Sequence, residues 1–450
     1  MSYRFQNHKF RNFLKVEPGK INLKIEMDKL KESRRAFFAK GLGLAGAGFF
    51  STFGQGLEAA VERTPSASNP SDLKITDVKC GYVRGAVYVK VYTNQDVWGC
   101  GEAVDAIQGT YHLVKRLGEQ IKGQNPLNPN RIAEQLRKAA FFGGAQSGVF
   151  VAVLTAIETA LWDLTGKVFG VPVYQLLGGK FRDKIRVYCD TALYTSTNPT
   201  PADYALAARN AVSRGYNAVK FDVDDARDPN KYDRFNWTAN PMEIDRMYNA
   251  IAAVRQEVGP NVDICVDMHG RYDAVTGLKM AKMYEDLNLM WLEEPVPADN
   301  IEVYKKISQE TSTPICTGEN VYLAYGFTRL LSENAVDIIM PDIQKAGGLG
   351  EAQRIANLAN LYYVPFSPHM VASFLGAMAA CHVCASVPNF QIMEWQIYMD
   401  TDQLWQDIVT YDGPRTQNSF ITLSEKPGIG VEINEEGMKK YAVKGVPFFE

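Results

Sequence analysis

The stretch Asp263-Ile264-Cys265-Val266-Asp267 is a short, mostly apolar run that ends in an acidic residue. The same pattern recurs in Leu289-Met290-Trp291-Leu292-Glu293 and in Pro314-Ile315-Cys316-Thr317-Gly318-Glu319. The step from Asp267 to Glu293 is 26 residues, and the step from Glu293 to Glu319 is again 26. A step of this length holds one strand, one helix and two loops, so it predicts successive βα units of a parallel sheet.

Asp267, Glu293 and Glu319 would then stand at the carboxyl ends of their strands. In a closed barrel those ends face one mouth, where active sites are built. Three carboxylates meeting there would repel one another unless a hard divalent cation neutralised them. The equal spacing, with His269 two residues after the first acid, therefore predicts a Mg²⁺ site. Three unrelated acids at loop starts are the alternative.

The composition is that of a soluble globular protein. The chain has 450 residues, of which 46% are hydrophobic and 22% are charged, enough for a large core in two or three domains. The formal net charge is −3 and Lys and Arg form no basic stripe, so nucleic acid is not an expected partner. Cys381 and Cys384 are separated by two residues, as in many zinc and redox motifs. They lie in an apolar helical segment without a second cysteine pair, which argues against zinc or redox chemistry.

Residues 1–70 read as an export signal and linker rather than as part of the fold. Ser33-Arg34-Arg35-Ala36-Phe37-Phe38 matches a twin-arginine signal, and a Gly- and Ala-rich stretch follows at 41–54. That stretch is too short and too rich in glycine to span a bilayer stably. We therefore expect a periplasmic protein; an amphipathic N-terminal helix in a cytoplasmic protein is the alternative. The cleavage site and the start, Met1 or Met27, stay open.

The rest of the chain divides by its periodicity. Residues 71–184 show strand alternation and then helical periodicity, which predicts an α+β capping domain. Residues 185–396 alternate between strand and helix, and residues 397–450 return to short strands that we expect to pack on the cap. The segment 185–396 contains eight β units, which is the number of strands that closes a parallel barrel. They lie at 185–190, 218–224, 263–267, 289–293, 314–319, 336–342, 363–369 and 390–394.

Several motifs together resemble the enolase superfamily, in its mandelate racemase group, from about Leu73 to Val446. The motifs are Ala160–Lys167 leading to Leu176–Gly179, the acids at 26-residue steps, Met340-Pro341-Asp342 with Gly347-Gly348, and Pro427–Val431. The resemblance implies a modified (β/α)₇β barrel of the TIM type under an α+β cap. It also implies a Lys or His base, Mg²⁺ and a homo-oligomer.

Asp267-Met268-His269-Gly270-Arg271 narrows the resemblance to the acid-sugar dehydratases, especially those acting on galactonate and mannonate. Racemases of the group more often carry a second Lys on the second barrel strand. Here Asp222 stands at that place, where the galactonate pattern usually has Asn. This departure weakens the hypothesis that the protein is a racemase, and it leaves the identity of the sugar undetermined.

The chemistry of a sugar acid assigns roles to the charged residues. A proton α to a carboxylate is too weakly acidic for an ordinary base, and its removal adds a second negative charge beside the first. A bound Mg²⁺ and a cationic side chain can stabilise that charge. Asp267, Glu293 and Glu319 are therefore the expected metal ligands, and Lys220 is expected at the substrate carboxylate.

Two histidines complete the expected site. His369 closes the seventh strand and Asp342 the sixth, so Asp342 can fix the tautomer of His369 as the base. His269 is expected to bind the substrate and to protonate the departing hydroxyl. Glu394, if protonated, would hydrogen-bond a carboxylate oxygen. Specificity is expected from cap loops near Tyr82 and Arg84 and from the insert at 226–241.

Three functional hypotheses follow. The first is a Mg²⁺-dependent dehydratase that converts a small sugar acid, an aldonate, to a 2-keto-3-deoxy acid. The second is a racemase, epimerase or cycloisomerase that shares the same enolate intermediate. The third is an exported sugar-acid binding protein without turnover, against which the pair His269 and His369 argues.

Overall fold

The computed structural model describes residues 70–191, 193, 198–225, 228, 231–233, 235–399, 401–413 and 415–450. The predicted twin-arginine signal lies outside the described residues, so it stays a prediction. All elements named below belong to one compact unit of the chain.

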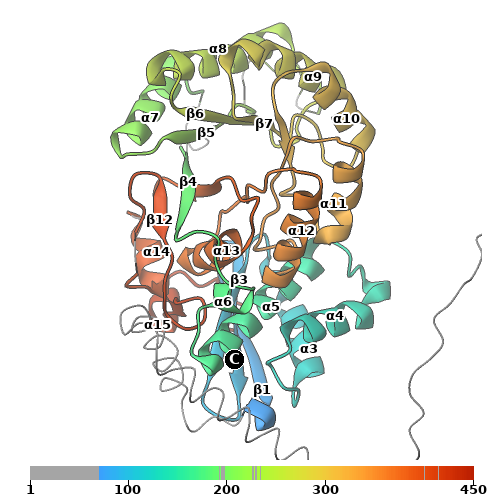
Figure 1. The fold of residues 1–450 in the computed structure, drawn as a ribbon, viewed down its shortest axis with the longest axis vertical. Coiled ribbons are helices and arrows are strands. Elements are labelled where there is room, and N and C mark those ends of the chain that lie inside the picture. The colour runs from blue at the N-terminus through green and yellow to red at the C-terminus, as the bar shows by residue number, and fades with distance from the viewer. Residues whose placement is uncertain are drawn as a thin grey trace, which may run out of the picture. The chain divides into compact units, whose positions relative to one another are not determined.

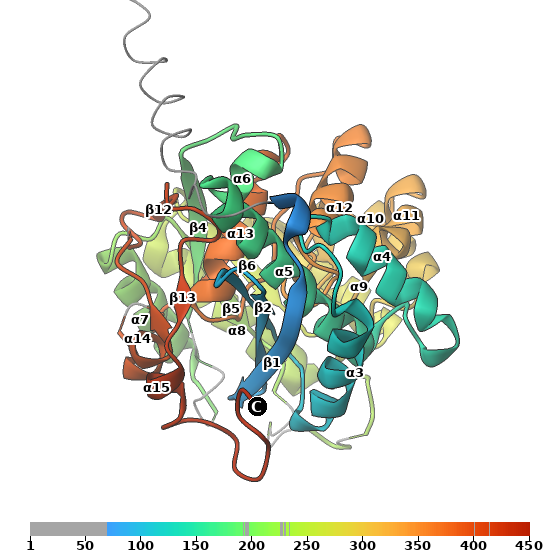
Figure 2. The same ribbon diagram turned by 90° about the horizontal axis from the view of Figure 1, so that it is seen from below.

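The N-terminal part of the described chain is a three-stranded antiparallel sheet covered by helices (Figure 2). Its strands are β1 (Ile75–Val83), β2 (Ala86–Thr93) and β3 (Trp98–Ala103), and its helices are α3 (Tyr111–Ile121), α4 (Pro129–Ala139) and α5 (Gly148–Phe169). Helix α5 packs closely on β3 because Gly99 and Gly101 lack side chains. A Cβ at either glycine would lie 2.0 Å from a carbonyl oxygen of α5.

Helix α5 is long and apolar enough to cross a membrane by length and composition alone. However, 89% of its most apolar window is buried inside the protein. An apolar face all round is also what a central core helix requires. Within the described residues, α5 is the helix around which the cap is packed.

The second part of the chain is a parallel sheet that curls inside a ring of helices (Figure 1). The strands β5 to β9 follow β4 in chain order and β10 pairs with β4; they are β4 (Lys184–Asp190), β5 (Ala218–Asp222), β6 (Asp263–Asp267), β7 (Trp291–Glu293), β8 (Ile315–Thr317), β9 (Ile338–Ile339) and β10 (Met393–Gln396). The helices of this part are α7 (Pro201–Ser213), α8 (Pro241–Val258), α9 (Ala274–Met283), α10 (Ile301–Glu310), α11 (Leu323–Ser332), α12 (Leu349–Leu361) and α13 (Phe374–Ser386). The short helix α6 (Val173–Leu176) precedes β4 and contacts α5 of the cap and α13. The predicted modified TIM-type barrel with an N-terminal cap is confirmed.

The predicted seventh strand, 363–369, is not a regular strand. Phe366 instead forms single bridges to Ile339 on one side and Phe390 on the other, and His369 bridges Asp342. Pro365 and Pro368 have no N–H, so an unbroken ladder cannot form there. The bridges nevertheless connect β9 to the segment that leads into β10, and they bring His369 beside Asp342.

Local sequence explains where two barrel helices begin. Thr200 and Asn240 are the N-caps of α7 and α8, and each forms a capping box with an acid three residues later, Asp203 or Glu243. A proline occupies the first position of both helices, where its missing N–H costs nothing. These caps fix the two helices that flank β5.

Alternation along the strands decides which side chains enter the barrel. A buried cluster inside the sheet contains Tyr188, Ala218, Cys265, Trp291, Cys316, Ile338, Met340 and Ile392. Side chains two residues further along point the same way. Lys220, Asp267 and Glu293 therefore face the interior at the carboxyl ends of their strands, whereas Val219 and Phe221 pack with the helices.

The C-terminal segment touches both parts. It contains α14 (Gln403–Ile408), β11 (Val409–Thr410), β12 (Phe420–Thr422), β13 (Glu432–Ile433) and α15 (Glu435–Met438). β12 pairs with β4 of the barrel. Further on, the backbone N–H groups of Val443 and Phe449 donate to the carbonyls of Tyr82 and Cys80 on β1. The chain end accordingly lies beside β1 (Figure 2).

Candidate active site

Three carboxylates lie in one row across neighbouring strands at the barrel mouth. Asp222 is the register partner of Asp267, and Asp267 is the register partner of Glu293. Neighbouring strands are about 4.8 Å apart, so the row brings like charges close together. We call Asp222, Asp267 and Glu293 the carboxylate row.

Lys220 lies two residues before Asp222 on β5, and its positive charge neutralises part of the negative charge of the carboxylate row. Its side chain is 3% exposed, and Nζ lies 3.2 Å from Oδ2 of Asp267 and 3.0 Å from Oε1 of Glu394. Burial alone would lower the pKa of Lys220, but Glu293 and Glu394 raise it well above its ordinary value. The lysine is therefore a permanent cation at the mouth.

Glu293 is the strongest sign that the row suits a cation. Its Oε1 is buried and has no hydrogen-bond partner. Burial and the charge of Asp267 raise the pKa of Glu293 well above its usual range. A hard divalent cation would satisfy the orphaned oxygen and remove the repulsion, so the donor set fits Mg²⁺.

The third predicted ligand, Glu319, faces His369. Oε2 of Glu319 lies 2.9 Å from Nε2 of His369, whose Nδ1 lies 2.8 Å from Oδ2 of Asp342. Burial opposes ionisation of Glu319, but His369 and Lys345 hold its pKa below the usual value. The hydrogen bond between Asp342 and His369 is the one that the sequence predicts; the role of His369 as a base stays a prediction.

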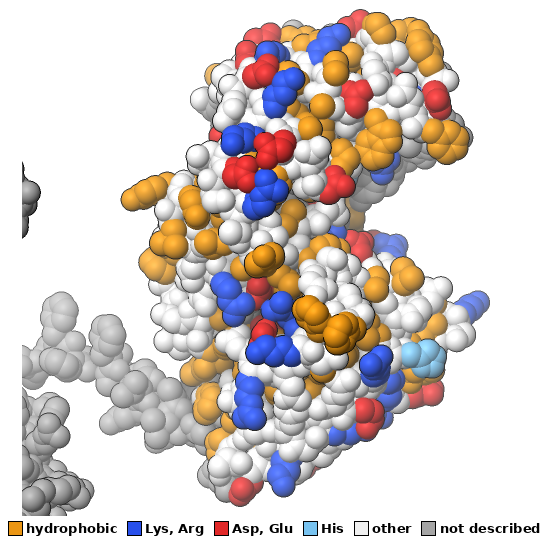
Figure 3. Space-filling model, turned by 90° about the vertical axis from the view of Figure 1, so that its right-hand side faces the viewer, with side chains coloured by type: hydrophobic (Ala, Val, Ile, Leu, Met, Phe, Trp, Pro, Cys, Tyr) orange, Lys and Arg blue, Asp and Glu red, His pale blue; other side chains and the backbone are white. Residues whose placement is uncertain are grey.

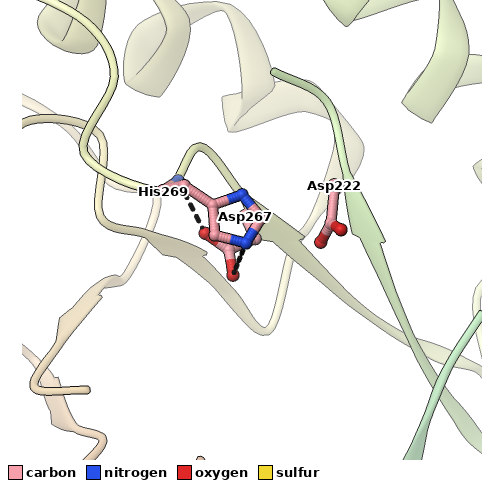
Figure 4. Close-up of side chains that lie close together, drawn as sticks. All are labelled: Asp222, Asp267 and His269. Atoms are coloured by element: carbon pink, nitrogen blue, oxygen red, sulfur yellow. Dashed lines mark hydrogen bonds and ion pairs between the residues drawn. The ribbon is translucent and has the colours of Figure 1, made fainter. Parts of the chain in front are cut away.

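The tightest set of potential ligand atoms differs from the predicted one. Among the described residues, the side chains whose ligand atoms all lie within 4.8 Å of one another are Asp222, Asp267 and His269 (Figure 4). Glu319 is drawn instead toward the imidazole of His369. Asp267 belongs to both sets, and Asp222 was noted in the sequence only as a departure from the family pattern.

His269 is held in place by three contacts at the end of β6. Its Nδ1 lies 2.7 Å from Oδ1 of Asp224, and its Nε2 lies 3.7 Å from Oδ2 of Asp267. Its backbone N–H donates to Oδ1 of Asp267 at 2.8 Å (Figure 4). Burial would lower the pKa of His269, but Asp267 and Asp224 raise it to about 11. The sequence did not single out Asp224; the signal would have been the alternation Lys220-x-Asp222-x-Asp224.

Asp222 gives the mouth a carboxyl group where a racemase would more often have a lysine. Burial and the charge of Asp267 raise the pKa of Asp222 to about 8 against the opposing effect of Lys220. The shift favours the protonated carboxyl group, which can donate as well as accept a hydrogen bond.

Glu394 lies on the eighth barrel strand, but it is the second residue of β10 rather than its last. It pairs with Lys220, and its Oε2 accepts from the backbone N–H of Met370 at 3.1 Å. Burial raises the pKa of Glu394, but Lys220 and His369 outweigh it and lower the pKa below the usual value. This arrangement favours the carboxylate, and the role of a protonated Glu394 in substrate binding stays a prediction.

Tyr82 and Arg84 have partners within the cap and the C-terminal segment. The hydroxyl of Tyr82 is hydrogen-bonded to Oγ1 of Thr110 at 2.9 Å, and the side chain is buried in the cap core. Arg84 lies 3.6 Å from Asp402. These contacts do not bring either residue to the carboxylate row, and their role in substrate binding stays a prediction.

Other residues do border the mouth. A cavity of about 500 Å³ is lined by Gln146 and Ser147 from the cap and by His269 and Glu294 from the barrel. Trp237, from the insert after β5, lines it as well. Figure 3 shows the surface hollowed between the cap below and the barrel helices above. Trp237 thus brings the insert at 226–241 to this cavity, and the role of the insert in specificity stays a prediction.

A parallel barrel with a buried lysine, clustered carboxylates and two histidines at the carboxyl ends of its strands defines an enzyme of the barrel class. Two family models match the chain: "Mandelate racemase / muconate lactonizing enzyme, N-terminal domain" at residues 58–178 and "Enolase C-terminal domain-like" at 203–437. The chain belongs to the enolase superfamily, in its mandelate racemase group.

Individual relatives agree with this placement. The chain is 38% identical over 385 residues to a D-xylonate dehydratase of Haloferax volcanii, covering 84% of this chain and 91% of the relative. It is 30% identical over 358 residues to a D-galactonate dehydratase of Variovorax paradoxus, covering 78% and 89%. A crystal structure of a mandelate racemase/muconate lactonizing enzyme-like protein from Rubrobacter xylanophilus matches with a TM-score of 0.80 and 42% identity. It covers 84% of this chain and 100% of the other.

Proposed function

We propose that the chain is a Mg²⁺-dependent acid-sugar dehydratase. It would remove the proton α to the carboxylate of an aldonate and eliminate the β-hydroxyl as water, leaving a 2-keto-3-deoxy acid. The observation that carries the proposal is the presence of two histidine–aspartate pairs, His369 with Asp342 and His269 with Asp224. In each pair Nδ1 of the imidazole is hydrogen-bonded to an aspartate oxygen. The similarity to a D-xylonate and a D-galactonate dehydratase supports it.

Asp267, Glu293 and Glu319 would hold the Mg²⁺. The ion would act as a Lewis acid on the substrate carboxylate and so make the α-proton more acidic. The orphaned Oε1 of Glu293 is the structural support for this ligand set. Asp222 lies in the same row, and its raised pKa lowers the charge that it adds to that set.

The two histidines would divide the proton transfers. His369 would take the proton from C2 with Nε2, because Asp342 occupies Nδ1 and stabilises the imidazolium that forms. Lys220 would hold the substrate carboxylate, where negative charge develops. His269 would deliver a proton to the hydroxyl on C3, so that water leaves. His269 follows β6, the third barrel strand, and His369 ends the bridged segment 363–369 that takes the seventh place, so the two lie on opposite sides of the mouth.

A racemase, epimerase or cycloisomerase would use the same first step. A two-base lysine–histidine racemase is the weaker alternative, since Asp222 stands on β5 where the second lysine would be. A binding protein without turnover would not need two imidazoles that are each oriented by an aspartate. Dehydration therefore remains the proposal.

A screen of acid sugars tests the proposal. The protein is incubated with Mg²⁺ and a panel of aldonates, and 2-keto acid is measured after derivatisation. We expect keto acid from at least one aldonate and none when a chelator removes Mg²⁺. Appearance of an epimer or a lactone without keto acid would favour the first alternative. Tight binding of an aldonate with no product at all would favour the binding protein.

We also propose that the protein is exported through its twin-arginine stretch, residues 33–38. The support is the sequence pattern alone, and a cytoplasmic location is the alternative. Replacing both Arg34 and Arg35 by Lys should keep the protein in the cytoplasm after cell fractionation, whereas the unchanged chain should reach the periplasm. Equal distribution of the two proteins would contradict export.

Finally, we propose that the enzyme is a homo-oligomer, on the resemblance to its family. Light scattering coupled to size exclusion measures the mass directly. A mass that is a multiple of the 50.1 kDa chain, or of its processed form, would support the proposal, and a monomer mass would contradict it.

A further inference from the structure

Asp224 is a buried acid at the mouth to which neither the sequence nor the comparisons assign a task. It lies two residues beyond the end of β5, and its side chain is 4% exposed. Its two oxygens have different partners: Oδ1 lies 2.7 Å from Nδ1 of His269, and Oδ2 lies 3.0 Å from Nε of Arg271. The acid is therefore held between a histidine and an arginine of the loop that follows β6.

The contact has the same form as the one on the other side of the mouth. In each pair an aspartate oxygen lies 2.7–2.8 Å from Nδ1 of a histidine. In each pair Nε2 then faces a carboxylate of the expected metal set, Asp267 or Glu319. Because the second nitrogen of an imidazole is oriented by the bond that the first one makes, each aspartate decides where its Nε2 points.

The backbone of the loop leaves His269 little other freedom. His269 has a φ of +45°, a left-handed conformation that few non-glycine residues adopt. Its N–H is bound to Oδ1 of Asp267, which fixes the start of the loop to the strand end. The ring itself is 33% exposed toward the cavity. Asp224 is thus the contact that fixes rotation of an imidazole whose backbone is already fixed.

We propose that Asp224, itself held by Arg271, is the positioning residue for His269 in the elimination step. It would keep the proton of the neutral ring on Nδ1 when His269 has given up its other proton, and keep Nε2 directed at the leaving hydroxyl. The proposal rests on the proposed function, because it assumes that His269 is the acid. Asp224 does not touch the reacting atoms, so its effect passes through the histidine.

The variant Asp224→Asn tests this with two rates measured on the same sample. In D₂O, deuterium entering C2 of recovered aldonate reports proton removal by His369, and 2-keto acid reports elimination. Asp224→Asn should keep the exchange within about threefold of the wild-type rate of proton removal. It should slow elimination by about 100-fold or more, as expected for loss of a histidine-orienting carboxylate. A merely structural acid would lower both rates together.

Four further variants serve as comparisons and controls for Asp224→Asn. His269→Asn should show the same split as Asp224→Asn, and the double variant should be no slower than either single one. Asp225→Asn changes the adjacent acid and should leave both rates as in the wild type. Asp224→Glu should recover part of the elimination rate. If Asp224→Asn eliminated water at the wild-type rate, or lost exchange and elimination equally, the proposal would be wrong.

A readout that needs no turnover separates this proposal from the proposed function. The chain has five histidines, so ¹H–¹⁵N spectra of imidazole-labelled, metal-free protein are simple to assign with His269→Asn. A hydrogen-bonded Nδ1–H signal of His269 should be present in the wild type and lost in Asp224→Asn. Absence of that signal in the wild type overturns the pairing. Its presence in a protein that forms no keto acid would leave the pairing intact and reject the dehydratase.

Discussion

At the scale of single residues, the mouth of the barrel holds several charged side chains that are buried together. The pKa of Lys220 is raised and that of Glu394 is lowered in each other's presence, so each favours the charged form of the other. Glu293 is the exception, since burial and Asp267 both oppose its ionisation and one of its oxygens has no partner. A divalent cation should therefore stabilise the fold through Glu293 more than through any surface acid.

Replacing Glu293 by Gln tests that balance. Wild-type protein should gain about 2–3 kcal/mol of stability from Mg²⁺ at about 100 times its dissociation constant. Glu293→Gln should lose most of this gain, because an amide oxygen is a weaker ligand than a carboxylate. The measurement is the melting temperature with and without Mg²⁺. Glu310→Gln, on the exposed end of α10, should respond to Mg²⁺ like the wild type, and an equal response of both variants would contradict the ligand set.

Much of the site was predictable because barrel strands repeat at a fixed interval. The 26-residue step was enough to align Asp267 with Glu293, whereas Glu319 lies beyond the end of β8 and faces His369. Asp342 was found one strand before His369. Asp224 was missed because it lies two residues beyond the end of β5, although the alternation of Lys220, Asp222 and Asp224 continues to it. Glu394 was predicted on the right strand but not at the right place along it, and its ionisation depends on Lys220, a contact that the sequence does not show.

At the scale of elements, the N-terminus of α12 shows how the cap and the barrel are fitted together. Glu158 of α5 accepts from the backbone N–H groups of Leu349 and Gly350 and from the indole of Trp162. Gly348 precedes the helix with a φ of +100°, and a Cβ there would lie 2.1 Å from Oε2 of Glu158. The glycine is thus required both by its backbone conformation and by the close approach of the carboxyl group.

Gly348→Ala should therefore lower the free energy of unfolding by about 2–4 kcal/mol, from a positive φ of about 1 kcal/mol plus a steric clash. Urea denaturation measures the loss. Gly178→Ala is the matched control, because Gly178 has a similar φ of +106° with nothing within 4 Å of its Cβ position. Gly178→Ala should lower the free energy of unfolding only by the part that comes from the positive φ, about 1 kcal/mol. Equal losses in the two variants would show that contact with Glu158 is unimportant.

Helix α13 is joined to the cap by a neutral histidine. The backbone N–H of Tyr174 donates to Nδ1 of His382, and Nε2 of His382 donates to the carbonyl of Ile429. Protonation would put a hydrogen on Nδ1 and remove the first bond. Burial accordingly lowers the pKa of His382 from 6.5 to about 4, although the carbonyl of Ile429 and the charge of Glu425 oppose the shift.

This pKa predicts a window of acid sensitivity. As the pH falls, the unfolded chain binds the proton first, so the contribution of His382 is complete above pH 6.5 and is lost between pH 6.5 and about 4. The loss should reach about 3 kcal/mol. Urea midpoints at pH 7, 5.5 and 4.5 measure it. His382→Gln should be less stable at pH 7 but should lose less stability across the window; an unchanged slope would contradict the assignment.

The barrel strands illustrate what periodicity predicts and what it cannot. Seven of the eight predicted β units contain regular strands, because apolar runs bounded by loops leave little choice. The segment 363–369 reads as a strand by its place in the series, yet Pro365 and Pro368 limit it to single bridges. Its position was predictable from the repeat, but its backbone pairing depended on where the missing N–H groups fall.

At the scale of the whole molecule, the chain end protects the cap. β1 is an edge strand, and the segment containing Val443 and Phe449 hydrogen-bonds to it. Phe449 is 7% exposed, and its ring packs so close to Gly81 that a Cβ at Gly81 would lie 2.6 Å from it. An uncovered edge strand invites pairing with other chains, so the segment contributes to both stability and solubility.

Phe449→Ala should cost about 3 kcal/mol of the free energy of unfolding, as expected for an emptied aromatic site. It should also increase aggregation on heating, because the edge of β1 becomes easier to expose. Phe142→Ala is the control, since Phe142 is fully exposed on the cap and should change stability by less than about 0.5 kcal/mol. If both variants melted together, the C-terminal segment would not be part of the folded unit.

The central claim is that two imidazoles on opposite sides of one mouth remove a proton and release a hydroxyl group. NMR of an aldonate in D₂O, with wild type, His369→Asn and His269→Asn compared, tests it most directly. Wild type should form a 2-keto-3-deoxy acid. His369→Asn should show neither keto acid nor deuterium at C2, and His269→Asn should exchange C2 without forming keto acid. Keto-acid formation by either variant at the wild-type rate would contradict the account.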